Sequence, residues 1–148
     1  MGSTFDYTQE ERDRDINAGL YQKFYIVTPV EDIEFTIGAE DTEVIEVQCQ
    51  VVDPAGDAME DTFCLQVLIC SDEDGLIPAA FSSVTLAATT GTVQVETTAD
   101  QDLQCVTDET GLLVFDLTDS ATSAETRYMA VKLPGGKMAV SEAITFAT

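Results

Sequence analysis

The sequence predicts an all-β protein, an antiparallel β-sandwich that follows a short N-terminal arm. After Lys23, apolar and polar residues alternate with a period of two through most of the chain. Turn-forming sequences interrupt this alternation at intervals of about ten residues, which is typical of a two-sheet sandwich. The chain has 148 residues, 45% of them hydrophobic, and this suits one packed domain with an appended segment.

Residues 1–22 are expected to form the arm, and residues 23–148 the sandwich domain. Within the arm, the Thr-Gln-Glu-Glu sequence at residues 8–11 fits a helix capping box, and Gly19 stands where a helix would end. A short helix over about residues 9–18 is therefore predicted. Its few apolar residues cannot form a full core-facing stripe, so the arm either docks on a neighbour or is a solvated tail.

Alternation predicts a series of strands in the sandwich domain. In the strand expected at residues 44–52, Ile45, Val47 and Cys49 share one face. The strand expected at residues 62–70 is apolar on both faces, which favours cover on both sides. Between them, Asp-Pro-Ala-Gly at residues 53–56 predicts a turn. The other expected strands cover residues 24–27, 34–37, 84–88, 93–95, 128–133 and 137–146, the last two joined through Pro-Gly-Gly at residues 134–136.

Residues 104–118 give the clearest local pattern, a strand, a tight turn and a second strand. Gly111 suits a turn position with positive φ, and the Asp108 side chain can cap the turn through nearby backbone. We therefore predict a β-hairpin here, packed against a second layer. The apolar positions of its two strands are Leu103, Cys105, Leu113, Phe115 and Leu117.

Acidic residues dominate the charge of the chain. There are 28 Asp and Glu residues against 6 Lys and Arg, a formal net charge of −22, and no Lys or Arg occurs from Phe24 to Thr126. Such a surface repels nucleic acid phosphates and anionic membranes, so neither is an expected partner. The acidity favours solubility over a specific cation-binding role.

The apolar segments, the N-terminal residues and the cysteine spacing indicate the cellular compartment in which the protein folds. No segment has the ~18 apolar residues of a membrane helix, and the N-terminus lacks the basic start and apolar run of a signal peptide. We therefore expect synthesis and folding in a cytoplasm. The four cysteines form no CxxC pair and are expected to be buried thiols, with a disulfide bridge as the alternative: Cys49, Cys64, Cys70 and Cys105.

The residue inventory does not favour catalysis. The chain has no His and no Trp, so the usual general base and the commonest transition-metal ligand are missing. The cysteines lie in strand patterns without an activating cation or base nearby in sequence. Asp-Glu-Asp-Gly at residues 72–75 lacks the spacing of a helix-loop-helix calcium loop; a solvated turn is preferred, with a loop-end cation site as the alternative. We predict a non-enzymatic protein with no cofactor and no metal site.

The arm carries the residues expected to bind a partner. Aromatic and Arg side chains are the usual anchors of protein interfaces, and the arm combines them with aliphatic residues. The predicted partner-binding residues are Phe5, Tyr7, Arg12, Arg14, Ile16, Leu20, Tyr21 and Lys23.

Three motifs carry a resemblance to a known module. They are Val-Val-Asp-Pro-Ala-Gly-Asp-Ala at residues 51–58, Thr-Asp-x-x-Gly at residues 107–111, and Leu-Pro-Gly-Gly at residues 133–136 followed by Val-Ser-Glu-Ala-Ile-Thr-Phe at residues 140–146. With them, residues 43–146, about two thirds of the chain, resemble an immunoglobulin-like module of bacteriophage virion proteins and, more distantly, of bacterial adhesins. The motifs are turn-forming, so the resemblance implies a fold more directly than a function.

The resemblance implies a structural protein that decorates the exterior of a phage capsid, as a decoration protein or head fibre. Its expected partners are the major capsid protein or other virion proteins, reached through the arm, and a homo-oligomer is left open. The alternative is a receptor- or carbohydrate-binding module of a phage tail or cell surface, and a module of a bacterial surface array comes third. The loops at residues 72–83 and 119–125 hold only Phe81 as an aromatic anchor, which favours decoration.

Overall fold

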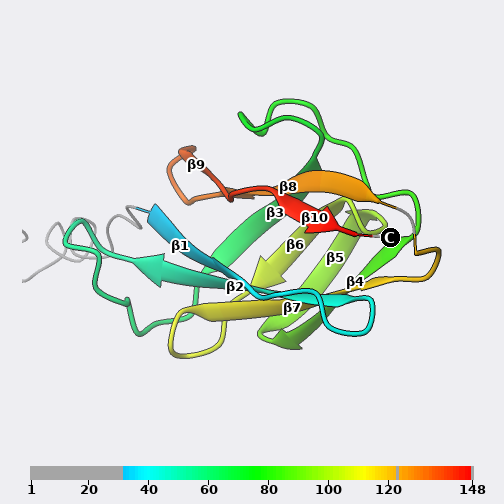
Figure 1. Ribbon diagram of the computed structural model, residues 1–148. Helices are drawn as coiled ribbons and strands as arrows, with labels where there is room; N and C mark the ends of the chain where they lie inside the picture. The colour runs from blue at the N-terminus through cyan, green and yellow to red at the C-terminus, as the bar shows by residue number, and fades with distance from the viewer. Residues whose placement is uncertain (1–31, 123, 148) are drawn as a thin grey trace, which may run out of the picture.

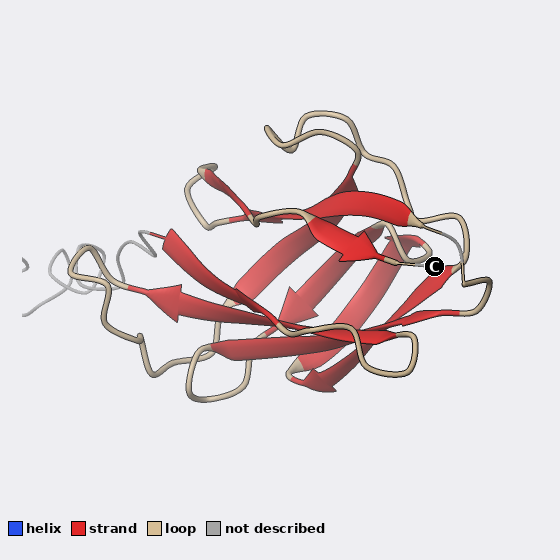
Figure 2. Cartoon of the chain, in the orientation of Figure 1, coloured by secondary structure: helices blue, strands red, loops and turns tan. Residues whose placement is uncertain are grey.

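The computed structural model describes residues 32–122 and 124–147, and every regular element in these residues is a β-strand (Figures 1 and 2). The predicted arm helix and the predicted strand at residues 24–27 lie outside this part of the chain. The strands are β1 (Asp32–Ile37), β2 (Val44–Val52), β3 (Cys64–Cys70), β4 (Val84–Thr90), β5 (Thr92–Thr98), β6 (Asp102–Val106), β7 (Leu112–Asp119), β8 (Glu125–Lys132), β9 (Met138–Val140) and β10 (Ile144–Phe146).

The strands form two antiparallel sheets that pack face to face as a sandwich (Figure 1). Sheet I has the order β1-β2-β7-β4. Sheet II has the order β10-β8-β3-β6-β5, and β9 also pairs with β8. The all-β, antiparallel sandwich predicted from the period-two alternation is thus confirmed.

The core lies between the two sheets and is built from the inward-facing residue of each alternating pair. In β2, Ile45 and Val47 are buried while Glu46 between them is exposed, as period two requires. The largest fully buried side chains are Phe115, Phe146, Ile45, Leu65, Ile69, Leu103, Leu113, Leu117, Met129 and Ile144.

Most of the predicted strands of the sandwich are confirmed to within a few residues. The expected strands at residues 34–37, 44–52, 62–70, 84–88 and 93–95 correspond to β1 to β5. The turn at residues 53–56 is present as well: the Gly56 N–H donates to the Asp53 carbonyl at 2.9 Å, and Gly56 has a φ of 86°.

The prediction of a hairpin at residues 104–118 is wrong, although its two strands and its turn exist. β6 belongs to sheet II and β7 to sheet I, so the turn crosses between the sheets instead of pairing its own strands. At the turn, the Thr107 N–H donates to the Phe63 carbonyl on the sheet II side. The Gly111 carbonyl accepts from the Val51 N–H on the sheet I side. Both strands turn their apolar residues to one core, which produces the same alternation as a hairpin would.

The single strand expected at residues 137–146 is also wrong, because two short strands occupy it. β9 pairs with the end of β8 and β10 pairs with its beginning. Between them Ser141 is buried, its N–H donates to the Met129 carbonyl, and its Oγ accepts from the Met129 N–H at 3.0 Å. The hydroxyl thus supplies an acceptor where the regular ladder is interrupted.

Candidate functional site

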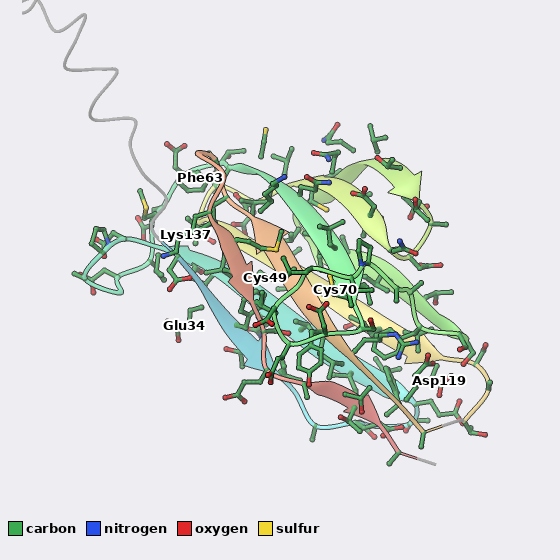
Figure 3. All side chains as sticks on the ribbon, turned by 90° about the horizontal axis from the view of Figure 1, so that it is seen from above. Glu34, Cys49, Phe63, Cys70, Asp119 and Lys137 are labelled. Atoms are coloured by element: carbon green, nitrogen blue, oxygen red, sulfur yellow. The ribbon has the colours of Figure 1, made fainter. Side chains whose placement is uncertain are left out.

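The residues predicted to bind a partner, from Phe5 to Lys23, lie outside the residues that the structure describes. What it does describe is the end of the sandwich where β1 begins. A pocket of about 270 Å³ lies there, and its lining includes Asp32 of β1 and Lys137, which Figure 3 labels. Its other lining residues are Val52, Asp53, Pro54 and Gly56.

The loop between β3 and β4 rests on the outer side of sheet II (Figure 1). It is organised by Asp72, whose carboxylate accepts the backbone N–H groups of Leu76 at 3.0 Å and Ile77 at 2.8 Å. These hydrogen bonds, that of Leu76 above all, hold the pKa of Asp72 below its ordinary value. The turn therefore has a fixed geometry despite its exposure.

The same loop presents two neighbouring aliphatic side chains to solvent. Leu76 is 74% exposed and Ile77 is 58% exposed, which makes them the most exposed large hydrophobic residues in the described part of the chain. The Ser71 N–H donates to the Ile77 carbonyl at 3.0 Å and so ties this tip to the end of β3. Exposed apolar residues held on a fixed loop are suited to contact with another protein surface.

The acidic turn at residues 72–75 is explained by its own backbone. The Asp72 carboxylate is directed at the amides of the loop, which is the role expected of a turn-forming aspartate. Within residues 32–122 and 124–147, no group of three or more His, Cys, Asp or Glu side chains is arranged to hold a metal ion. In the same residues no helix has the length and apolar character that a bilayer crossing requires.

Phe81, the aromatic residue of the loops, belongs to the core. It is 5% exposed and packs edge-to-face on Phe146, with ring centroids 5.4 Å apart. The Arg127 guanidinium lies over the Phe81 ring, 5.9 Å from its centroid, and pairs with Glu125 at 2.7 Å. Phe81 is therefore a packing residue instead of an exposed anchor.

Three of the four cysteines are buried, and the prediction is wrong for Cys64, which is exposed at the start of β3 on its outer face. Burial raises the pKa of the Cys49 thiol strongly and that of Cys105 to about 12. Burial, reinforced by the charge of Asp72, also raises the pKa of Cys70. These three side chains are therefore thiols, not thiolate nucleophiles, at neutral pH. All four cysteines are free (Figure 3 labels Cys49 and Cys70).

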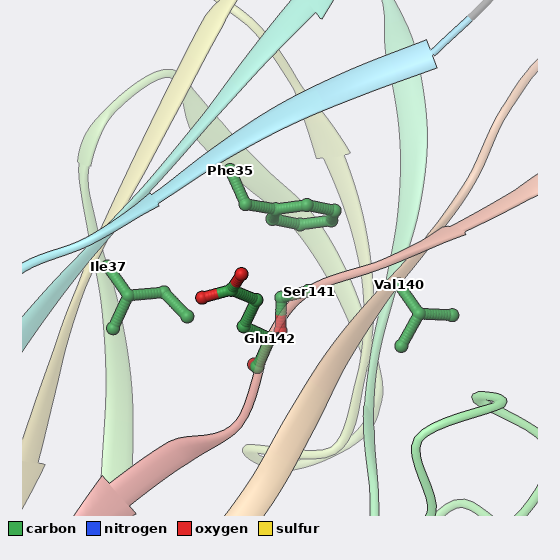
Figure 4. Close-up of a pocket in the computed structure, with 5 residues that line it drawn as sticks. All are labelled: Phe35, Ile37, Val140, Ser141 and Glu142. Carbon is green, nitrogen blue, oxygen red and sulfur yellow. Dashed lines mark hydrogen bonds between the residues drawn. The ribbon is translucent and has the colours of Figure 1, made fainter.

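A groove that the sequence did not indicate lies between the edges of the two sheets (Figure 4). Half-buried Phe35 and Ile37 of β1 form one wall. The other wall comes from the chain between β9 and β10, and its Glu142 side chain points toward the space between Phe35 and Ile37. The groove has a volume of about 340 Å³, and its remaining lining residues are Val140 and Ser141. Alternation in β1 indicated which residues face inward, but not that the strand would be an edge.

Comparisons with known proteins give no family to which these surfaces could be assigned: no family model, no curated protein and no solved structure matches this chain.

Proposed function

We propose that this chain is a non-enzymatic structural protein of a phage virion that decorates the capsid exterior through its N-terminal arm. The observation that carries the proposal is the division of the chain into two chemically different parts. From Asp32 onward, the strands bury a continuous apolar core of their own. The aromatic and cationic side chains of residues 1–22 precede that core, and they have the composition of an interface anchor.

The negative charge of the sandwich domain supports the proposal that the domain lies on the exterior of a capsid. Between Phe24 and Thr126 there is no Lys or Arg, so neighbouring sandwiches repel each other and remain soluble while the arm holds them. The partner would be the major capsid protein or another virion protein, and the protein would be made in the host cytoplasm. Neither nucleic acid nor membrane is a partner in this proposal.

We further propose that the sandwich is immunoglobulin-like. Sheet I, β1-β2-β7-β4, matches the A-B-E-D sheet of that fold, and in sheet II β8 and β3 occupy the positions of strands F and C. β6 and β5 extend sheet II beyond β3, as strands C′ and C″ do in variable-type domains. Two features differ from the variable-type order: β4 precedes β5 and β6 in the chain, whereas strand D follows C′ and C″, and β5 at the C″ position precedes β6 at the C′ position.

Co-sedimentation with assembled heads of the phage that encodes the chain, prepared without this protein, tests the proposed function. We expect the full chain to bind such heads and a chain that begins at Lys23 to stay folded and monomeric but unbound. Equal binding by both forms would show that the arm is not the anchor. If neither form binds, decoration is abandoned in favour of the second candidate.

The second candidate is receptor binding, and the exposed Leu76 and Ile77 favour it. In this role the β3–β4 loop would contact a cell surface, whereas the burial of Phe81 removes the aromatic anchor that such a loop commonly uses. The variant Leu76→Ser/Ile77→Ser separates the two roles. It should abolish adsorption to host cells if the loop binds a receptor, and it should leave attachment to heads unchanged if the arm is the anchor.

A further inference from the structure

The groove between β1 and the chain that links β9 to β10 places a carboxylate beside apolar side chains. Phe35 and Ile37 pack partly against the core, and each leaves part of its side chain in the groove. The Glu142 carboxylate points toward the space between them (Figure 4). Within residues 32–122 and 124–147, no hydrogen bond or ion pair reaches this carboxylate. Its negative charge is therefore not neutralised by the described residues.

The backbone from which Glu142 projects is held in place by Ser141. The Ser141 hydroxyl donates to the Glu142 carbonyl at 2.8 Å and accepts from the Met129 N–H at 3.0 Å. Ser141 is buried, and its own N–H donates to the Met129 carbonyl. These hydrogen bonds attach this segment to β8, so the carboxylate projects from a defined position opposite β1.

A carboxylate beside aromatic and aliphatic carbon is complementary to an arginine side chain. A guanidinium pairs with a carboxylate through two parallel hydrogen bonds, stacks on an aromatic ring, and carries an aliphatic stem that packs on apolar surface. A lysine ammonium is more strongly hydrated and lacks the planar geometry for stacking. The groove volume of about 340 Å³ is enough for one such side chain. Glu142 and Phe35 together therefore favour arginine.

The polar groups of the lining favour an arginine of another protein over a free small molecule. Apart from Glu142, the polar side chain of the lining is Ser141, whose hydroxyl is engaged with Met129 and with the Glu142 carbonyl. A free amino acid would thus find no group to bind its own ammonium and carboxylate. The formal net charge of −22 also attracts a basic protein surface toward the domain.

We propose that the groove binds an arginine side chain presented by a partner protein. The guanidinium pairs with the Glu142 carboxylate and lies against the Phe35 ring, and the aliphatic stem packs along Ile37. Within the described residues, no Lys or Arg of this chain lines the groove. The site is separate from the arm, so the proposal does not depend on what the arm binds.

Titration of the full chain with N-acetyl-arginine amide, followed by NMR, tests the proposal. At about 0.15 M salt, which screens general attraction to the acidic surface, the amide signals of Phe35, Ile37 and Glu142 should shift saturably. We expect a Kd on the order of millimolar for this single residue. N-acetyl-lysine amide has the same charge and should bind at least about threefold more weakly. The absence of saturable shifts at these residues, or equal binding of the two probes, would overturn the proposal.

Two variants that remove the same charge separate the groove from the general acidity of the domain. Glu34 precedes Phe35 in β1 but is exposed on the opposite face of the strand, and Glu142 is exposed as well, so neither substitution disturbs the core. Glu142→Gln should weaken binding of the arginine probe about fivefold, whereas Glu34→Gln should leave it unchanged. Equal losses in the two variants would contradict the assigned site.

Two further measurements test the source of the arginine. Free arginine should bind no more tightly than the blocked probe, and tighter binding would assign the groove to a free amino acid. The full-chain variant Arg12→Gln/Arg14→Gln should bind the probe with unchanged affinity. A rise of about threefold or more would mean that the chain's own arginines compete for the groove, and would overturn the assignment to a partner. Because none of these measurements uses phage heads, their failure is distinct from failure of the proposed function.

Discussion

Single aspartates organise several turns of this sandwich. The Asp53 carboxylate accepts the N–H groups of Ala55 and Asp57, each at 2.9 Å. The Asp108 carboxylate accepts those of Thr110 at 2.8 Å and Leu112 at 3.0 Å. Asp72 does the same in the β3–β4 loop. Part of the acidity that first suggests a cation site therefore serves backbone geometry.

The glycine of the inter-sheet turn should be hard to replace. Gly111 has a φ of 73°, and a Cβ there would collide with the Met59 carbonyl oxygen. Gly56 has a φ of 86°, but a Cβ there meets nothing within 4 Å. We expect Gly56→Ala to cost about 1 kcal/mol from backbone strain alone, and Gly111→Ala about 3 kcal/mol from strain and collision. Denaturant unfolding measures both values, and equal losses would contradict the assigned turn.

Stability should depend on the ionised form of Asp108. The Thr110 hydroxyl above all, and the backbone N–H groups of Leu112 and Thr110, lower the pKa of Asp108 in the folded state. Its stabilising contribution is therefore complete above the unfolded pKa of about 4 and is lost as the pH falls through the lower folded value.

We accordingly expect Asp108→Asn to lower the melting temperature at pH 7 by about 2 °C, and the difference from the parent to vanish toward pH 2. Glu109→Gln removes the same charge from the neighbouring exposed residue and should have no such effect. A deficit of Asp108→Asn that is equal at both pH values would rule out this account.

Thiol chemistry should single out Cys64. It is exposed, while the other three cysteines are buried and their thiols are held in the protonated form. A thiol reagent should therefore modify one cysteine per folded chain at pH 8, and all four after denaturation. Cys64→Ser should abolish the native reaction. Modification of two or more thiols in the folded parent would contradict the burial seen here.

At the scale of elements, alternation identifies strands but not their partners. Leu103 and Cys105 of β6 alternate like Leu113 and Phe115 of β7, because both strands turn one face to the same core. That pattern is identical in a hairpin and in a crossing between two sheets. The crossing is decided by more distant pairings, of β6 with β3 and of β7 with β2, which no local pattern contains.

Local sequence patterns likewise could not predict features that depend on contacts between two distant segments. The groove requires the edge of β1 and the chain at Ser141 to meet, and they come from opposite sheets. The break between β9 and β10 depends on the Ser141 hydroxyl and the Met129 backbone. By contrast, the exposure of Cys64 could have been found, since it shares the outer face of its strand with Gln66.

At the scale of the whole molecule, charge and apolar anchors are segregated. The sandwich is acidic, and in its described part Arg127 is held by Glu125 and by the Ala80 carbonyl. The arm combines Arg12 and Arg14 with aromatic side chains ahead of the first described strand. In our proposal, electrostatic repulsion keeps neighbouring domains apart while the arm supplies the affinity.

The claim that the arm is the anchor is tested most directly by transferring it. Residues 1–22 fused to an unrelated soluble domain should co-sediment with phage heads that lack the protein, and should saturate at the same number of copies per head as the full chain. The same fusion with Phe5→Ser, Tyr7→Ser and Tyr21→Ser serves as the control and should stay in the supernatant. The account is contradicted if the fusion fails to bind while a chain beginning at Lys23 sediments with the heads.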